Sequence, residues 1–76
     1  MTKKEIIKIL IKINPNIEEC IKKKAHFLND GYLDSFSIVQ FLLEVELLIK
    51  KKINMKNIKR DNFSNVDNIL KFINKQ

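Results

Sequence analysis

Apolar residues recur at every third or fourth position in three stretches of this 76-residue sequence, at about residues 2–14, 35–50 and 64–73. This spacing places the apolar side chains of each stretch on one face of an α-helix. No stretch of useful length alternates between apolar and polar residues, and the chain holds one proline and one glycine. The sequence therefore predicts an all-α fold whose helices are joined by turns rich in Asn and Asp.

The first predicted helix begins at Thr2 and ends at Asn14-Pro15. Thr2 and Glu5 have capping-box spacing, and Pro15 cannot continue a helix. Residues 16–34 are expected to form a long connection with one short helical turn and a sharper turn at Asp30-Gly31. The residues expected to contact the core in these segments are Ile6, Ile7, Leu10, Ile11 and Ile13, then Ile17, Cys20, Ile21, Phe27 and Leu28.

The second predicted helix, about residues 35–50, is apolar on nearly every side. Its expected core stripe consists of Ile38, Leu42, Val45 and Ile49, flanked by Phe41 and Leu48, with Ser37, Gln40 and Glu44 opposite. Phe36, Leu43 and Leu47 lie beside the polar strip, outside that stripe. A small domain cannot easily bury both faces of a helix, so one face is expected to meet a partner.

A short third helix is expected around Met55 and Ile58. Ser64 or Asn65 is expected to cap the last helix, whose core stripe consists of Val66, Ile69, Leu70 and Ile73. The fold expected from these elements is one domain over residues 1–76, with three main helices, one short third helix and a long first loop.

The size and residue types of the chain favour a binding or carrier role over catalysis. A domain of 76 residues has little stability to support a deep cleft with several buried polar groups. His26 is the only histidine and is expected in a loop, and Cys20 is expected to be a small buried hydrophobe. The sequence has neither a Gly-rich phosphate loop nor zinc-ligand spacing, so we expect no metal and no enzymatic activity.

The single cysteine excludes an intramolecular disulfide and favours a reducing compartment, so we expect a cytoplasmic protein. Lys8 and Lys12 interrupt the apolar N-terminal stretch at helical spacing, which is typical of an amphipathic helix and not of an export signal. No apolar run is long enough to cross a bilayer, and we expect a monomer without membrane insertion.

The formal net charge of +6 raises a second hypothesis, a basic helical module that binds nucleic acid or an anionic surface. Fourteen of the fifteen cationic residues are Lys, and only Arg60 has the planar fork favoured for phosphate and guanine contacts. The lysines are spread over the chain, with clusters at 22–24 and 50–52, and none lies between Ser35 and Lys50. Solvated lysines are therefore the preferred interpretation.

Asp34 and Ser35 precede the most apolar helix. Both residue types are favoured at helix starts, so a plain N-cap explains them in isolation. In this chain the pair follows the Asp30-Gly31 turn, with Leu33 directly before it.

The segment DGYLDSF, residues 30–36, resembles the attachment motif of acyl and peptidyl carrier proteins, in which a Gly and two further residues precede Asp-Ser-Leu or Asp-Ser-Met. The length of the following helix, the short third helix and the segment 63–69 are also similar to this family. Residues 60–63 and their spacing from Ser35 look most like D-alanyl carrier proteins. The resemblance implies the four-helix carrier fold.

The resemblance also implies that Ser35 carries a 4'-phosphopantetheine arm, attached from coenzyme A by a phosphopantetheinyl transferase. The terminal thiol would hold an acyl or aminoacyl group as a thioester, loaded by an ATP-dependent ligase and removed by a downstream transferase. Asp34 would position the serine and contribute to transferase recognition. Such a carrier is not itself an enzyme, and nucleic acid is not among its partners.

Carrier proteins are usually acidic along the helix after the serine, and this chain is not. Phe36, Gln40, Leu43 and Leu47 are therefore expected to form the docking face, with Glu44 and Glu46 as the only nearby acids. This departure favours a dedicated pathway, such as D-alanyl or other amino-acid transfer, over bulk fatty-acid synthesis. An interaction domain with this fold that is never modified is the remaining alternative.

Overall fold

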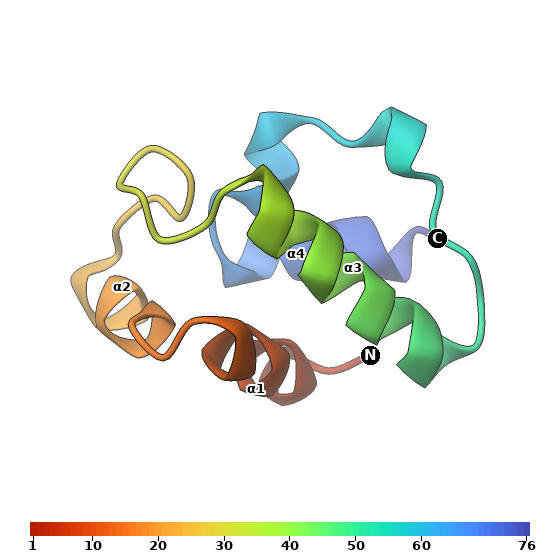
Figure 1. The fold of residues 1–76 in the computed structure, drawn as a ribbon, viewed down its shortest axis with the longest axis horizontal. Coiled ribbons are helices and arrows are strands. Elements are labelled where there is room, and N and C mark those ends of the chain that lie inside the picture. The colour runs from red at the N-terminus through yellow and green to blue at the C-terminus, as the bar shows by residue number, and fades with distance from the viewer.

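In the computed structural model, the chain folds into four α-helices and two short 3-10 helices; the structure describes residues 1–76 apart from the side chain of Asn57. In chain order the elements are α1 (Lys3–Ile13), α2 (Ile17–Lys23), α3 (Ser35–Ile49), η1 (Met55–Asn57), η2 (Arg60–Phe63) and α4 (Val66–Asn74) (Figure 1). No strand occurs in the described part of the chain, which confirms the predicted all-α fold.

Side-chain caps begin the three longest helices where the sequence predicts them. Thr2 and Glu5 form the expected capping box, in which the Thr2 amide donates to Glu5 Oε1 at 2.9 Å and the Glu5 amide donates to Thr2 Oγ1 at 3.3 Å. Asp34 caps α3. Asn65, and not Ser64, caps α4 by accepting from the Asn68 amide at 2.8 Å. Each cap pairs an amide that the helix itself leaves without a partner.

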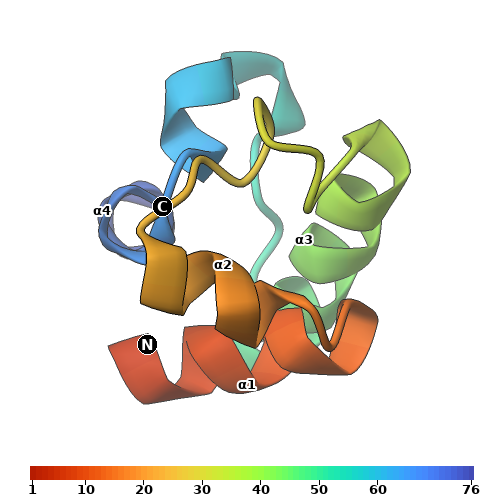
Figure 2. The same cartoon turned by 90° about the vertical axis from the view of Figure 1, so that its left-hand side faces the viewer.

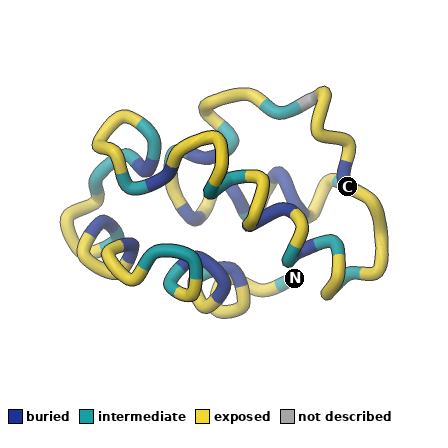
Figure 3. Tube along the Cα trace, in the orientation of Figure 1, coloured by how far each residue is buried: buried dark blue, intermediate teal, exposed yellow. Residues whose placement is uncertain are grey.

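The apolar faces of the helices converge on one core. Figure 2 shows α3 and α4 on opposite sides of the molecule, with α1 at the bottom, α2 directly above it and the 3-10 helices at the top. The buried residues lie on the inward turns of every α-helix (Figure 3). At the centre, Phe63 meets Phe41 edge-on at 6.1 Å between ring centroids and lies 5.8 Å from Phe72. These aromatic contacts join η2 to α3 and α4.

The short elements differ from the prediction in two places. The long connection holds a full helix, α2, because Ile17 and Cys20 bury one face of it, and because acidic residues in its first turn and lysines in its last complement the helix dipole. The predicted short third helix is replaced by η1 and η2. Only Phe63 is buried there, so the segment has no apolar face that would support a longer helix.

Two details of the core differ from the prediction. Ile9, which was not among the expected core residues, is buried beside Ile6 and Leu10, while Ile7, Ile11 and Ile13 pack against the core as expected but are only half-buried. Leu48 was expected to flank the core but is 57% exposed. It lies in the last turn of α3, next to the exposed residues 50–52, where little else covers the helix.

None of the helices formed by the described residues is both long and apolar enough to span a bilayer.

Candidate functional site

The loop before Ser35 is fixed at both ends by buried side chains. Phe27 and Leu33 are both buried in the core. The Phe27 amide donates to the Ser64 carbonyl at 3.0 Å, and the Leu33 amide donates to the Phe27 carbonyl at 2.8 Å. The segment between them is therefore closed into a compact loop, and Leu33 delivers Asp34 and Ser35 to a defined position at the surface.

Hydrogen bonds within this loop hold its tip. His26 Nδ1 accepts from the amides of Leu28 at 3.1 Å and Asn29 at 3.0 Å. The His26 amide donates to Asp30 Oδ2 at 2.7 Å. Gly31 has φ +81°, a left-handed conformation that residues with a Cβ rarely adopt. His26 is thus a loop residue, as predicted, and its ring supports the turn.

Two longer-range hydrogen bonds connect the loop to the rest of the fold. Asn14 Nδ2 donates to the Tyr32 carbonyl at 2.8 Å, which links the end of α1 to the segment before Asp34. Arg60 Nη2 donates to Asn29 Oδ1 at 2.8 Å, which links η2 to the loop tip. Arg60 is the only arginine in the chain, and in this structure its guanidinium holds a loop.

Asp34 and Ser35 lie together at the exposed start of α3. Asp34 Oδ1 accepts from the Ser37 amide at 2.8 Å, and Ser35 is the first helical residue. This amide hydrogen bond lowers the pKa of the Asp34 carboxyl, because it favours the charged form. No hydrogen bond to Ser35 Oγ occurs among the described residues, so its hydroxyl is free for chemistry at the positive end of the helix dipole.

We expect Asp34→Ala to lower the melting temperature and Asp34→Asn to restore most of the loss, because an Asn side chain also accepts the Ser37 amide. The lowered pKa of Asp34 determines how its contribution to stability changes with pH. The charge of Asp34 stabilises the fold above its ordinary pKa of 3.8, and this contribution is lost as the pH falls through the lower folded-state pKa. The advantage of wild type over Asp34→Asn should therefore shrink on acidification. Thermal melts of the three proteins across that range measure both effects, and an Asp34→Ala protein that melts like wild type would contradict the cap.

The four predicted docking residues share one exposed face of α3. Phe36, Gln40, Leu43 and Leu47 fall within about 60° of one another around the helix axis, opposite the buried Val45. Phe36 is 71% exposed, Leu43 51% and Leu47 79%. We call these four residues the α3 stripe. It begins one residue after Ser35 and runs along most of the helix.

The two acids of α3 are engaged inside the molecule, which sequence reasoning did not foresee. Lys12 Nζ of α1 donates to Glu44 Oε1 at 3.0 Å and to Oε2 at 3.2 Å. The Ile53 amide donates to Glu46 Oε2 at 2.7 Å. Both partners lie outside α3, so no periodicity within that helix could have revealed them. The helix after Ser35 therefore presents no unengaged carboxylate to a partner.

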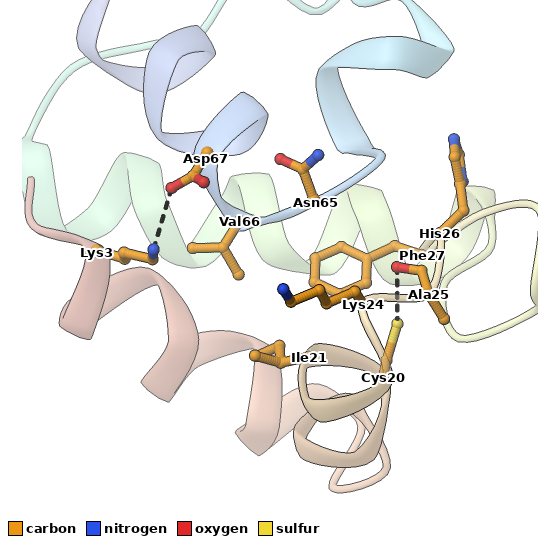
Figure 4. A pocket seen from close by; sticks show the side chains of 10 residues that line it. All are labelled: Lys3, Cys20, Ile21, Lys24, Ala25, His26, Phe27, Asn65, Val66 and Asp67. Atoms are coloured by element: carbon orange, nitrogen blue, oxygen red, sulfur yellow. Dashed lines mark hydrogen bonds and ion pairs between the residues drawn. The ribbon is translucent and has the colours of Figure 1, made fainter.

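A hollow of about 460 Å³ lies between α1, α2 and the start of α4, away from the predicted site residues (Figure 4). The Lys3–Asp67 ion pair, at 3.1 Å, spans from α1 to α4 beside it. Cys20 is buried at its floor, where Sγ lies 3.5 Å from the Ala25 carbonyl oxygen. Burial, with Asp30 and Glu19 nearby, raises the pKa of this thiol. Cys20 is a buried core residue, as predicted.

Comparison of the chain with protein-family models, with curated proteins and with solved structures found no match in any of the three.

Proposed function

We propose that this protein is an acyl or aminoacyl carrier whose Ser35 bears a 4'-phosphopantetheine arm. The observation that carries the proposal is the placement of Ser35. Its hydroxyl is exposed and free at the first residue of a 15-residue helix, after a loop fixed by Phe27 and Leu33. The α3 stripe starts beside it. An attachment serine needs such access for a modifying enzyme and such a rigid base for the arm.

The attachment step uses Ser35 as the nucleophile. Ser35 Oγ attacks the phosphorus of coenzyme A that bears the pantetheine, a new Oγ–P bond forms, and the P–O bond within the diphosphate breaks. Adenosine 3',5'-bisphosphate leaves with the electron pair, and the hydroxyl proton passes to a base of the transferase. The new phosphodiester would lie at the N-terminal end of α3, where the dipole favours a negative charge by about 0.3–1 kcal/mol.

The residues around Ser35 fit such a group. The side chain is exposed and Asp34, already held by the Ser37 amide, stands next to it as a fixed charge for recognition by the transferase. When bound, the group supplies a thiol that holds the cargo as a thioester. The chain would contribute position and recognition, while a separate ATP-dependent ligase and a transferase perform the catalysis. A cytoplasmic monomer would have coenzyme A and ATP at hand.

The cargo is expected to belong to a dedicated pathway, with D-alanyl or another aminoacyl group ahead of a fatty-acyl chain. The reason is the surface of α3. Glu44 and Glu46, the two acids after Ser35, accept hydrogen bonds from Lys12 and from the Ile53 amide, and three of the four stripe residues are apolar. Enzymes that select carriers by their acidic helix would gain little from this face.

The intact mass of the protein tests the attachment. After incubation with coenzyme A and a broad-range phosphopantetheinyl transferase, we expect the mass of wild type to rise by one phosphopantetheine group. Ser35→Ala should gain nothing, because it lacks the nucleophile. Ser37→Ala is the matched control, since it removes a hydroxyl from the same turn but keeps the backbone amide that Asp34 caps. It should be modified like wild type.

An unmodified wild type, or an adduct that forms equally on Ser35→Ala, would refute the carrier proposal. The fold would then be that of an interaction domain in which Ser35 only begins a helix.

A further inference from the structure

The C-terminal half of α3 carries a groove with an apolar floor and a basic rim. It has a volume of about 540 Å³ and is lined by Leu43, Glu46, Leu47 and the three lysines at 50–52. Leu43 and Leu47 belong to the α3 stripe, so the groove continues the apolar face that starts next to Ser35. One surface thus runs from the attachment serine to the lysines.

The backbone on both sides of the three lysines is anchored by the fold. Lys50 ends α3 in a left-handed conformation, with φ 54°, and the chain then returns to the core at the buried Ile53. Glu46 accepts the Ile53 amide at 2.7 Å and so ties the returning chain to the helix. Lys50, Lys51 and Lys52 are all exposed, and none forms an ion pair with a described residue. Their charges are available to a partner.

Negative charge lies at the opposite end of the same helix. Asp34 stands at the Ser35 end, with Asp30 in the preceding loop, and both are exposed. A helix of 15 residues rises about 21 Å from its first to its last residue. The face therefore begins beside the exposed carboxylate of Asp34, is largely apolar along the middle and ends at three lysines about 21 Å away.

We propose that the enzymes which load or unload Ser35 dock on α3 through an apolar surface with carboxylates at one end, and that these carboxylates meet Lys50–Lys52. This proposal rests on the carrier function. It also fixes a direction: the partner's active-site opening would face Ser35, and its acidic residues would lie about one length of α3 away. The apolar contact supplies affinity, and the charges set orientation and association rate.

The uneven distribution of charge along this face of α3 favours a protein over a lipid bilayer as the partner. An anionic bilayer presents a uniform negative plane, which would attract the lysines but repel Asp34 and Asp30 at the other end of the helix. A protein surface can place its carboxylates at one end only. The same reasoning weighs against the uniform phosphate backbone of a duplex.

A pair of helical peptides tests this complementarity on the unmodified protein. Both carry Leu along one face; one has Glu beside the Leu row, and its twin has Lys at the same positions. In titrations followed by NMR, we expect the Glu peptide to bind at least about tenfold more tightly than the Lys twin. The shifted amides should be those of the α3 stripe and of residues 50–52.

Two double variants separate local recognition from net charge. Lys51→Glu/Lys52→Glu and Lys22→Glu/Lys24→Glu change the net charge equally. Lys22 and Lys24 belong to the end of α2, and α2 lies at the opposite end of the long axis from the C-terminal end of α3 (Figure 1). The first should abolish the preference for the Glu peptide, and the second should retain it. Equal effects of the two variants, or shifts outside α3 and residues 50–52, would overturn the proposal.

Two further binding experiments test whether the partner is a membrane or a nucleic acid instead. Wild type is mixed with vesicles of phosphatidylcholine, with or without phosphatidylserine, and with duplex DNA and RNA. Suppose that wild type binds the vesicles or the nucleic acid, that Lys51→Glu/Lys52→Glu abolishes this binding, and that the protein does not prefer the Glu peptide. This result would overturn the proposal in favour of a membrane or a nucleic acid. The peptide titration tests the docking proposal, and the mass measurement tests the carrier function, so the two can be refuted independently. A protein that takes the phosphopantetheine group without peptide selectivity refutes the docking proposal, and one that is selective but unmodified refutes the carrier function.

Discussion

Phe63→Ala is expected to cost about 3–5 kcal/mol of unfolding free energy, because a fully buried phenyl ring is replaced by a cavity. Phe63 is 0% exposed and contacts Phe41 of α3 and Phe72 of α4, so the loss falls where η2 joins the two helices. A domain of 76 residues has roughly 4–11 kcal/mol in total, at about 0.05–0.15 kcal/mol per residue. Denaturation by urea, followed by circular dichroism, should show a large fall in the midpoint.

Phe36→Ala is the matched control for this change. The same side chain is removed from the same protein, but Phe36 is 71% exposed and contributes little to the core. Its unfolding free energy should stay within about 0.5 kcal/mol of wild type. If both variants lost similar stability, Phe36 would be packed in the folded protein and would not be available for docking.

Thiol labelling should distinguish the modified protein from the unmodified one. We expect no fast-reacting thiol in the unmodified protein and one in the modified protein. Cys20 is buried and its pKa is raised by that burial, so little thiolate is present and the reagent reaches it only when the structure opens. The arm on Ser35 would end in an exposed thiol. Labelling with a chromogenic disulfide reagent at neutral pH, in buffer and in denaturant, measures both groups.

Cys20→Ala is the control that assigns the signals. Before modification it should show no thiol even in denaturant, and after modification it should show the fast-reacting thiol alone. A fast reaction of unmodified wild type in buffer would mean that Cys20 is accessible, contrary to its burial in the core.

If the protein is the carrier proposed above, the lysines at the far end of α3 would change which enzymes it can serve. Charges on an interface affect association rate and partner choice more than affinity, and like charges opposite one another are costly. An enzyme with a basic docking surface would meet Lys50–Lys52 at one end of α3 and no unengaged acid along it. A carrier with this face would thus be separated from enzymes with basic docking surfaces by repulsion as well as by missing contacts.

The sequence by itself determined the helices with long apolar stripes and their starts. Thr2, Asp34 and Asn65 are short polar residues that precede stretches with apolar residues at helical spacing, and each side chain accepts an amide three residues further on. The exposed α3 stripe was also readable, because α3 carries more apolar residues than one buried face can hold. These features depend on contacts between near neighbours in the chain.

The tertiary structure alone decided the features that depend on distant residues. It made α2 a helix and left η1 and η2 short, because the core offers a place to Ile17 and Cys20 but only to Phe63 in the later segment. It also paired Glu44 with Lys12, 32 residues away, so that a cation lies next to a carboxylate which has no basic neighbour in the sequence. The charge pattern along α3 is therefore a property of the fold, since an ion pair between two helices exists only once packing has brought them together.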